Sequence, residues 1–297
     1  MGQNAMNGII GDIISMSVND GPGIRTSVYL KGCPLRCAWC HNPEMQRPHP
    51  QAMVLPSRCT HCGSCQNCPS GARGKAGVYD SSRCTGCGLC ASVCPSEACR
   101  VIGTSMSAGD VLRRVLPDKP FFRRHGGVTI SGGEPLFQAD FVLELAGLLS
   151  ENGIGVMLET CGCAPWEAIE PLLPLIDCFL YDWKITDPEV HRKWTGTDNR
   201  LIRENLKTLH GCGANIVLRC PVIPGVNDTP SHFEGIARLL RDLPDIRRVD
   251  LLPYHALGND KRTQLGLARD GFHSPSEETV LSWHRQLSAL CPVPVFL

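Results

Sequence analysis

The sequence lacks an excess charge of either sign, a long apolar run and a recognisable leader. Lys plus Arg and Asp plus Glu both number 29, so the formal net charge is zero. A nucleic-acid partner, which needs a clustered basic surface, is therefore not expected. No apolar run approaches the roughly 20 residues that span a bilayer. Residues 1–6 show no basic region followed by an apolar stretch, and Met6 stands where an acylation signal needs Ser or Thr. We expect a cytoplasmic protein without a membrane segment.

Cysteine is the residue in excess. The chain of 297 residues has 18 cysteines, and 11 of them lie between Cys33 and Cys94. A disulfide framework is one interpretation, but tight C-x2-C runs in a long chain without an export signal favour metal binding. The other cysteines are expected to pack as small hydrophobic side chains; they are Cys99, Cys161, Cys163, Cys178, Cys212, Cys220 and Cys291.

Sequence texture divides the chain into three parts. Residues 1–47 contain a β-branched and aromatic strand, predicted over 24–31, and the first cysteine motif. Residues 48–104 are rich in Cys, Gly, Pro and Ser and have almost no apolar periodicity. They cannot build a core of their own, so metal is the expected source of their stability. Residues 105–297 alternate between predicted helices and strands, which indicates a parallel sheet.

The predicted elements favour an α/β fold of the partial (β/α)6-barrel type with residues 48–104 inserted as a small domain. A flat doubly wound sheet is the alternative that the sequence leaves open. Further strands are predicted over residues 128–131, 154–159, 178–182, 215–219, 249–252 and 293–296. Helices are predicted over residues 107–116, 139–150, 166–173, 188–210, 232–243 and 276–290.

Polar residues recur at the predicted carboxyl ends of the strands, which is where β/α barrels place their chemistry. Asp182 and Lys184 are two residues apart, so on an extended strand their side chains would point to the same side. The complete set is Glu134, Glu159, Thr160, Asp182, Lys184, Arg219 and His255.

The first cysteine motif, C-x3-C-x2-C, follows the first predicted strand. Its members are Cys33, Cys37 and Cys40. Three thiolates suit a [4Fe-4S] cubane with one iron left open, as a catalytic metal centre requires. A zinc site with His41 as the fourth ligand is the alternative, but His41 adjoins Cys40 and has poor reach to the same ion.

Two further runs of cysteines lie in residues 48–104. The second of them matches the bacterial ferredoxin pattern C-x2-C-x2-C-x3-C-P in full, whereas the first has only two residues before its last cysteine. In two-cluster ferredoxins the fourth cysteine of each run ligates the other cluster. That rule gives two cubanes, one on Cys59, Cys62, Cys65 and Cys94 and the other on Cys84, Cys87, Cys90 and Cys68. The short spacing leaves the reach of Cys68 open, and two zinc ribbons are the alternative.

The first motif and its setting resemble the radical S-adenosylmethionine (SAM) enzymes, and among them the activating enzymes of glycyl radical enzymes. The resembling segments run in order over nearly the whole chain. They are Asp20–Arg25, Lys31–Cys40, His41–Glu44, Ser131–Pro135, Glu159–Thr160, Asp182–Lys184, Arg219–Gly225 and Leu251–His255. The cysteine-rich insert is similar to that of the larger subgroup of these activating enzymes, which carries two additional [4Fe-4S] clusters.

The resemblance implies roles for individual residues. The cluster on Cys33, Cys37 and Cys40 would bind SAM at its open iron. Gly132, Gly133 and Glu134 would contact the SAM amino group, and Asp182, Lys184, Arg219 and His255 would belong to the SAM site. Glu159, Thr160 and Asp182 match a monovalent-cation site, with Glu159 at a position where some members have aspartate. Asp20 matches a position that meets the glycine loop of the partner.

The resemblance also implies the activity. Reductive cleavage of SAM would give methionine and a 5′-deoxyadenosyl radical, which abstracts the α-hydrogen of a glycine in the partner enzyme. Three [4Fe-4S] clusters, SAM, an electron donor such as flavodoxin or ferredoxin, an anaerobic setting and a monomeric chain are expected. The insert clusters either relay electrons or simply hold the insert folded. Rival interpretations are a radical SAM enzyme acting on a small molecule or peptide, and a ferredoxin-type electron carrier.

Overall fold

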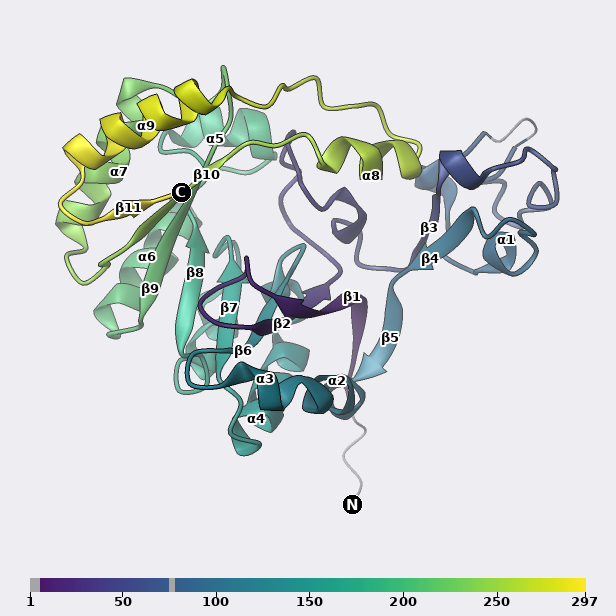
Figure 1. Cartoon of the computed structure of the whole chain (residues 1–297), viewed down its shortest axis with the longest axis horizontal. Coiled ribbons are helices and arrows are strands. Elements are labelled where there is room, and N and C mark those ends of the chain that lie inside the picture. The colour runs from purple at the N-terminus through teal and green to yellow at the C-terminus, as the bar shows by residue number, and fades with distance from the viewer. Residues whose placement is uncertain (1–5, 75–77) are drawn as a thin grey trace.

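The computed structural model describes residues 6–74 and 78–297. In these residues the strands form one nine-stranded sheet and one separate two-stranded sheet. Residues 1–5, part of the segment in which a leader was sought, and residues 75–77 of the insert lie outside the described residues. Figure 1 shows two lobes, with the large sheet and its helices in one and the cysteine-rich insert in the other.

The large sheet has the order β11-β10-β9-β8-β7-β6-β2-β1-β5, and neighbouring strands are parallel from β2 to β11. The parallel strands are β2 (Arg25–Leu30), β6 (Gly127–Gly132), β7 (Val156–Thr160), β8 (Cys178–Asp182), β9 (Ile216–Val222), β10 (Val249–Pro253) and β11 (Val295–Phe296). Every one of these strands overlaps a predicted strand. The sheet is mixed and open, as expected for a partial barrel, because its first and last strands are not paired with each other.

Helices cover the sheet in the expected βα alternation. The longer ones are α2 (Ala108–Val115), α4 (Ala139–Glu151), α5 (Pro188–Thr195), α6 (Arg200–Gly211), α7 (Pro230–Asp242), α8 (Gly258–Gln264) and α9 (Glu277–Leu290). The short ones are α1 (Leu89–Ser92) and α3 (Lys119–Phe122). Ser107 caps α2 in a reciprocal capping box with Asp110, as its sequence indicates. The core joins the apolar faces of these helices to strand residues such as Val28, Ile130 and Leu218, which are fully buried.

Two predicted helices differ from the structure. Residues 166–173 form two short 3-10 turns, η7 (Trp166–Ala168) and η8 (Glu170–Leu172), because Pro171 and Pro174 interrupt helical hydrogen bonding. The segment predicted over 188–210 is divided into α5 and α6 by Gly196, which adopts a φ of 85° at the C-cap of α5.

The sequence did not predict the antiparallel edge of the sheet. β1 (Asn7–Ser17) pairs with β2 on one side and with β5 (Thr104–Ser107) on the other. β1 lacks the continuous apolar run of a central strand, because only its first half is buried. β5 returns the chain from the insert directly to the sheet.

The insert is joined to the barrel by a two-stranded stem. β3 (Gln51–Val54) and β4 (Cys99–Ile102) pair antiparallel, and the Leu55 N–H donates to the Ala98 carbonyl at 2.8 Å where the stem opens into the cysteine runs. Between these strands the insert holds only α1 and short 3-10 turns among its described residues, including η2 (Pro56–Arg58) and η4 (Ser81–Arg83). A segment with so little regular structure and apolar core needs another source of stability.

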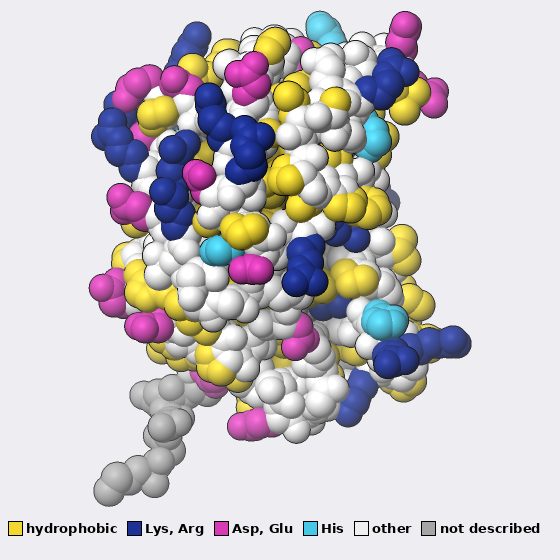
Figure 2. Space-filling view, turned by 90° about the vertical axis from the view of Figure 1, so that its left-hand side faces the viewer, with side chains coloured by type: hydrophobic (Ala, Val, Ile, Leu, Met, Phe, Trp, Pro, Cys, Tyr) yellow, Lys and Arg dark blue, Asp and Glu magenta, His cyan; other side chains and the backbone are white. Residues whose placement is uncertain are grey.

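Charge is mixed on the face in Figure 2, where basic and acidic side chains are interspersed. In the part of the chain that the structure describes, no helix has the length and apolar character needed to cross a membrane.

Candidate active site and cluster-binding loops

The loop with the first cysteine motif leaves the end of β2 and is held against α5. The Arg36 N–H donates to the Thr195 carbonyl at 2.7 Å, and the Ala38 N–H donates to the Trp194 carbonyl at 3.0 Å. On its other side the Gly32 N–H donates to the Met45 carbonyl at 2.7 Å. The loop is therefore fixed by backbone contacts at both flanks, independently of any metal.

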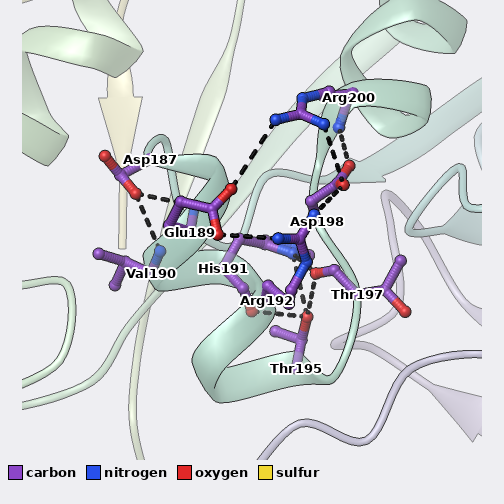
Figure 3. A network of polar contacts seen from close by, with 9 residues as sticks. All are labelled: Asp187, Glu189, Val190, His191, Arg192, Thr195, Thr197, Asp198 and Arg200. Atoms are coloured by element: carbon purple, nitrogen blue, oxygen red, sulfur yellow. Dashed lines mark hydrogen bonds and ion pairs between the residues drawn. The ribbon is translucent and has the colours of Figure 1, made fainter.

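A polar network stabilises the end of α5 that carries these carbonyl acceptors (Figure 3). Arg192 pairs with Glu189 at 2.8 Å and with Asp198 at 2.6 Å. The Thr195 hydroxyl lies 3.0 Å from Nδ1 of the buried His191, whose Nδ1 also contacts the Thr197 carbonyl. These contacts connect α5 to the start of α6 and so keep the support of the cysteine loop in place.

The three thiols of this loop are close enough to one another to interact electrostatically. Burial raises the pKa of Cys37 to about 12, and Lys184 opposes that rise. Burial also raises the pKa of Cys33 and of Cys40. In the described residues no three His, Cys, Asp or Glu side chains are placed to share a single metal ion. A cubane places each thiolate on a different iron, so the loop fits a cluster better than a zinc ion.

The turn after β6 packs directly on the cysteine loop. The Gly133 N–H donates to the Leu30 carbonyl at 2.9 Å, and the Glu134 N–H donates to the Gly32 carbonyl at 2.8 Å. A Cβ at Gly132 would lie 2.2 Å from the Leu30 oxygen, and one at Gly133 would lie 2.4 Å from the Gly32 oxygen. Both glycines are thus required for the close approach of two backbone segments.

Glu134 is buried, and its carboxylate accepts three hydrogen bonds. Thr160 Oγ1 donates to Oε1 at 2.7 Å, the Leu136 N–H donates to Oε1 at 3.1 Å, and the Cys161 N–H donates to Oε2 at 2.7 Å. Burial raises the pKa of Glu134, and these hydrogen bonds oppose the rise. Glu134 therefore fastens the end of β6 to the end of β7, a role that its sequence motif does not reveal.

Two ion pairs lie at the ends of the next strands. Lys184 Nζ lies 2.7 Å from Asp182 Oδ2, and both side chains are largely buried. Although burial lowers the pKa of Lys184, Asp182 and Cys37 raise it well above its ordinary value, so the cation persists beside the cysteine loop. Arg219 Nη1 lies 3.0 Å from Glu159 Oε1, and Ser131 donates to Glu159 Oε2 at 2.8 Å. A cation next to Cys37 suits a ligand that carries a carboxylate.

The predicted cation ligands have separate partners in the structure. Asp182 is paired with Lys184, Glu159 with Arg219, and the Thr160 hydroxyl donates to Glu134. The monovalent-cation site stays a prediction.

Asp20 lies on the turn between β1 and β2. Its Oδ2 accepts hydrogen bonds from the hydroxyls of Ser17, Ser27 and Tyr29, with the Ser17 bond at 2.7 Å. Burial raises the pKa of Tyr29 and of Glu159, and the Asp20 charge adds to both rises, so Asp20 lies within electrostatic reach of side chains on β2 and β7.

His255 follows β10 and stacks edge-on against His41, with 4.1 Å between the ring centroids. The next helix, α8, holds the same loop through Lys261, whose Nζ lies 2.7 Å from Glu44 Oε1 and donates to Asn42 Oδ1 at 2.6 Å. The far end of α8 touches the insert, since Gln264 accepts from Arg100 at 3.3 Å. Thus α8 lies between the two cysteine-rich regions, as Figure 1 also shows.

The insert contains a cavity of about 290 Å³ lined by sulfur. All four cysteines that the ferredoxin rule assigns to one cubane line it, namely Cys68, Cys84, Cys87 and Cys90, and Cys65 of the other set joins them. Cys68 faces this cavity despite its short spacing, so the residues fit the predicted group.

The fourth cysteines of the two runs share a local arrangement. Each is followed by Pro and then Ser, and the serine hydroxyl lies 3.4 Å from the sulfur in Cys68–Ser70 and 3.7 Å in Cys94–Ser96. The Ser70 contact lowers the pKa of Cys68 to about 7. Burial raises the pKa of Cys94, but backbone and Ser96 hydrogen bonds bring it down to about 7. Both thiols are thus prepared to act as thiolates, the form that binds metal.

Sequence reasoning missed several residues around these sites. Lys261 contacts a loop more than two hundred positions earlier in the chain, which no local pattern can reveal. Arg73 and Cys99, which meet in the insert at 3.1 Å, lie outside the spaced ligand positions. For the contacts between the serine hydroxyls and the cysteine sulfurs, the only indication in the sequence was the repeated tripeptide Cys-Pro-Ser.

Comparison with known proteins agrees with this geometry. Residues 27–240 match the model of the radical SAM superfamily. The isethionate sulfite-lyase activating enzyme of Oleidesulfovibrio alaskensis is 43% identical over 87% of this chain and 87% of its own. The (2S)-3-sulfopropanediol dehydratase activating enzyme of Klebsiella oxytoca is 41% identical over 88% of this chain and 86% of its own. A solved radical SAM methyltransferase from Sphaerobacter thermophilus shares the fold, with a TM-score of 0.52 at 17% identity over 91% of this chain and 66% of its own.

The chain is a member of the radical SAM superfamily, because the family model spans most of its length. Within that superfamily it belongs to the activating enzymes of glycyl radical enzymes, since its relatives at about 40% identity over most of both chains are activating enzymes of this kind.

Proposed function

We propose that this chain generates a glycyl radical in a partner enzyme by cleaving SAM to methionine and a 5′-deoxyadenosyl radical, which removes the α-hydrogen of one partner glycine. The observation that carries the proposal is the convergence of three half-buried cysteines and the Lys184 cation at the strand ends, in a chain related throughout to activating enzymes. We further propose that the chain works as a cytoplasmic monomer under anaerobic conditions.

Cys33, Cys37 and Cys40 would hold the catalytic [4Fe-4S] cluster. When bound, such a cluster supplies the electron for SAM cleavage. Lys184 would hold the SAM carboxylate, because it is a persistent cation beside Cys37. Arg219 and His255 would complete the SAM site, whereas Glu134 would keep the Gly132–Gly133 backbone in position for the amino group.

The insert, residues 48–104, would form a ferredoxin-like domain with two more [4Fe-4S] clusters. One would lie in the cavity lined by Cys68, Cys84, Cys87 and Cys90. The other would bind Cys59, Cys62, Cys65 and Cys94. We propose that these clusters receive electrons from a flavodoxin- or ferredoxin-type donor. The position of α8, between the insert and the catalytic loop, supports electronic contact between the two regions.

Asp20 would face the glycine loop of the partner. Its carboxylate, on the turn after β1, is oriented by three hydroxyl groups, which supports a role in a specific contact. The cation site of Glu159, Thr160 and Asp182 would require these side chains to leave their present partners.

The test is electron paramagnetic resonance on anaerobically reconstituted protein with SAM, reductant and a panel of glycyl radical enzymes. A glycyl doublet in one partner, lost in Cys37→Ala, is the expected result and would identify the partner. Cys212→Ala is the matched control, because Cys212 is exposed at the end of α6.

Two other outcomes would contradict the proposal. SAM cleavage without a doublet in any partner would favour a small-molecule or peptide substrate. Electron transfer that survives Cys37→Ala, without SAM cleavage in either protein, would favour an electron carrier. Removing the insert clusters tests the relay separately, since undiminished SAM cleavage with a protein donor would leave them a structural role only.

A further inference from the structure

Among the described residues of the insert, one buried cation lies among the cysteines. Arg73 is 5% exposed and lines the sulfur-rich cavity together with Cys65 of one predicted ligand set and Cys90 of the other. Its Nη2 donates to the sulfur of Cys99 at 3.1 Å. Its Nε is buried and has no hydrogen-bond partner in the described residues. Burying a guanidinium with an unsatisfied donor is costly unless nearby negative charge compensates for it.

The position of Arg73 is fixed by its neighbours. Its guanidinium carbon lies 4.3 Å from the ring centroid of Tyr79, and the two residues form an isolated antiparallel bridge. The Tyr79 hydroxyl donates to the Ala52 carbonyl, which ties this pair to the stem strand β3. An arginine held by stacking and by backbone pairing is a built feature of the cavity, since a surface arginine would retain its rotamer freedom.

No oxygen anion is among the partners that the structure gives Arg73. The groups that face it are the sulfurs of Cys99, Cys90 and Cys65, and the presence of these thiols raises its pKa although burial alone would lower it. A site that offers a guanidinium with an unsatisfied Nε–H to sulfur fits a ligand with negative charge on sulfur, as an iron–sulfur cluster with thiolate ligands has.

We propose that Arg73 lies between the two insert clusters and raises the reduction potential of both through its charge and its N–H donors. This inference rests on the proposed insert clusters. Reduction adds negative charge to a cluster, so a nearby buried cation stabilises the reduced form. Because one side chain faces both ligand sets, it would shift the two potentials in the same direction. Arg73 is a positioning and tuning residue, and it ligates no iron.

The experiment compares wild-type protein with three variants at this position. Arg73→Gln and Arg73→Met remove the charge, and Arg73→Lys retains it. Arg83→Gln is the matched control, because Arg83 is an exposed arginine of the same insert, next to Cys84, and water screens its charge. Iron content and midpoint potentials from redox titration followed by electron paramagnetic resonance are measured for each protein, without SAM or partner.

The expected result is full iron content, about four irons for each of three cubanes, with insert potentials that become more negative in the neutral variants. We expect at least a tenfold change in the reduction equilibrium, which is about 59 mV for a one-electron couple. Arg73→Lys should restore most of the shift, and Arg83→Gln and the catalytic cluster should show less than a threefold change.

Each alternative result has a defined meaning. Unchanged insert potentials in fully loaded neutral variants would overturn this inference and leave the proposed function intact. Iron for a single cubane in the wild-type protein would overturn both this inference and the proposed insert clusters. A third outcome is loss of insert iron in both neutral variants together with full iron loading of Arg73→Lys. This outcome would support the inference, because it would show that the positive charge at position 73 is what the insert clusters require. Loss in all three variants would overturn it and assign Arg73 to folding.

Discussion

Replacing Glu134 with glutamine tests whether this carboxylate holds two strand ends together. In the structure its two oxygens accept from Thr160 Oγ1, the Leu136 N–H and the Cys161 N–H, and no solvent reaches the group. Glutamine is almost isosteric but replaces one acceptor oxygen with a donor. If its amide oxygen occupies the Oε1 position, its NH2 group meets the Cys161 N–H, and two buried donors face each other.

The magnitude follows from those two donors. A buried polar group left without a partner costs about 1–3 kcal/mol, so with two such donors Glu134→Gln should lower the free energy of unfolding by roughly 2–6 kcal/mol. If the amide is placed the other way round, its NH2 group faces the Thr160 hydroxyl and the Leu136 N–H instead of the Cys161 N–H. The expected loss of unfolding free energy is then of the same order. Glu204→Gln on α6 is the matched control, because Glu204 is exposed and should change the stability by less than about 0.5 kcal/mol.

The assay is anaerobic guanidinium unfolding of both variants and the wild-type protein without cluster or SAM, followed by far-UV circular dichroism. A lower midpoint with an unchanged slope would support the argument, since the slope reports the surface exposed on unfolding. A stability of Glu134→Gln within 0.5 kcal/mol of the control, as an order-of-magnitude limit, would refute it. Such a result would mean that the three hydrogen bonds to the Glu134 carboxylate stabilise the fold no more than the hydrogen bonds that glutamine can make.

Two further predictions concern backbone and protonation. Gly162→Ala should destabilise the fold by clearly more than Gly213→Ala in thermal melts, and equal losses would contradict this. Both glycines have positive φ, at 68° and 74°, but a Cβ at Gly162 would lie 1.8 Å from the Tyr181 hydroxyl oxygen, whereas nothing lies within 4 Å at Gly213. Burial lowers the pKa of His232 to about 4 from its usual 6.5, and its Nδ1 accepts from the Thr186 N–H at 3.2 Å. Neutral His232 therefore contributes stability that is complete above pH 6.5 and is lost as the pH falls toward 4, by about 2 kcal/mol at pH 5. Unfolding free energies at pH 7.5 and 5 should show a smaller decline in His232→Gln than in the wild-type protein, and identical declines would exclude this histidine as the source.

The central sheet was predictable because its strands are short runs that are apolar or nearly so. Runs such as residues 178–182 and 249–252 are apolar throughout or nearly so, and the structure confirms both as strands. The antiparallel edge was not predictable, since half of β1 is solvent-facing and its pairing with β5 joins segments about a hundred residues apart. The local sequence of a strand does not indicate which distant strand it pairs with.

The candidate site was predictable in its composition and less so in its contacts. The strand-end rule selected Glu134, Asp182 and Lys184, and the structure places them around the cysteine loop. The rule says nothing about which groups satisfy a buried carboxylate, so the three donors to Glu134 were missed. The role of α8 was also missed, because Lys261 follows no motif and contacts the loop only through the tertiary fold.

The two-stranded stem has a consequence for how the insert can be removed or exchanged. The chain enters and leaves the insert at adjacent positions, where the Leu55 N–H donates to the Ala98 carbonyl. For the stability of the barrel, the segment between these positions is therefore equivalent to one long hairpin loop. The closure entropy of such a loop grows slowly, by only about 0.6 kcal/mol for each doubling of its length. A module of any size can therefore be grafted at this stem, or replaced by a tight turn between β3 and β4, with little thermodynamic penalty to the sheet. The stem is in this sense a natural junction between the barrel and the insert.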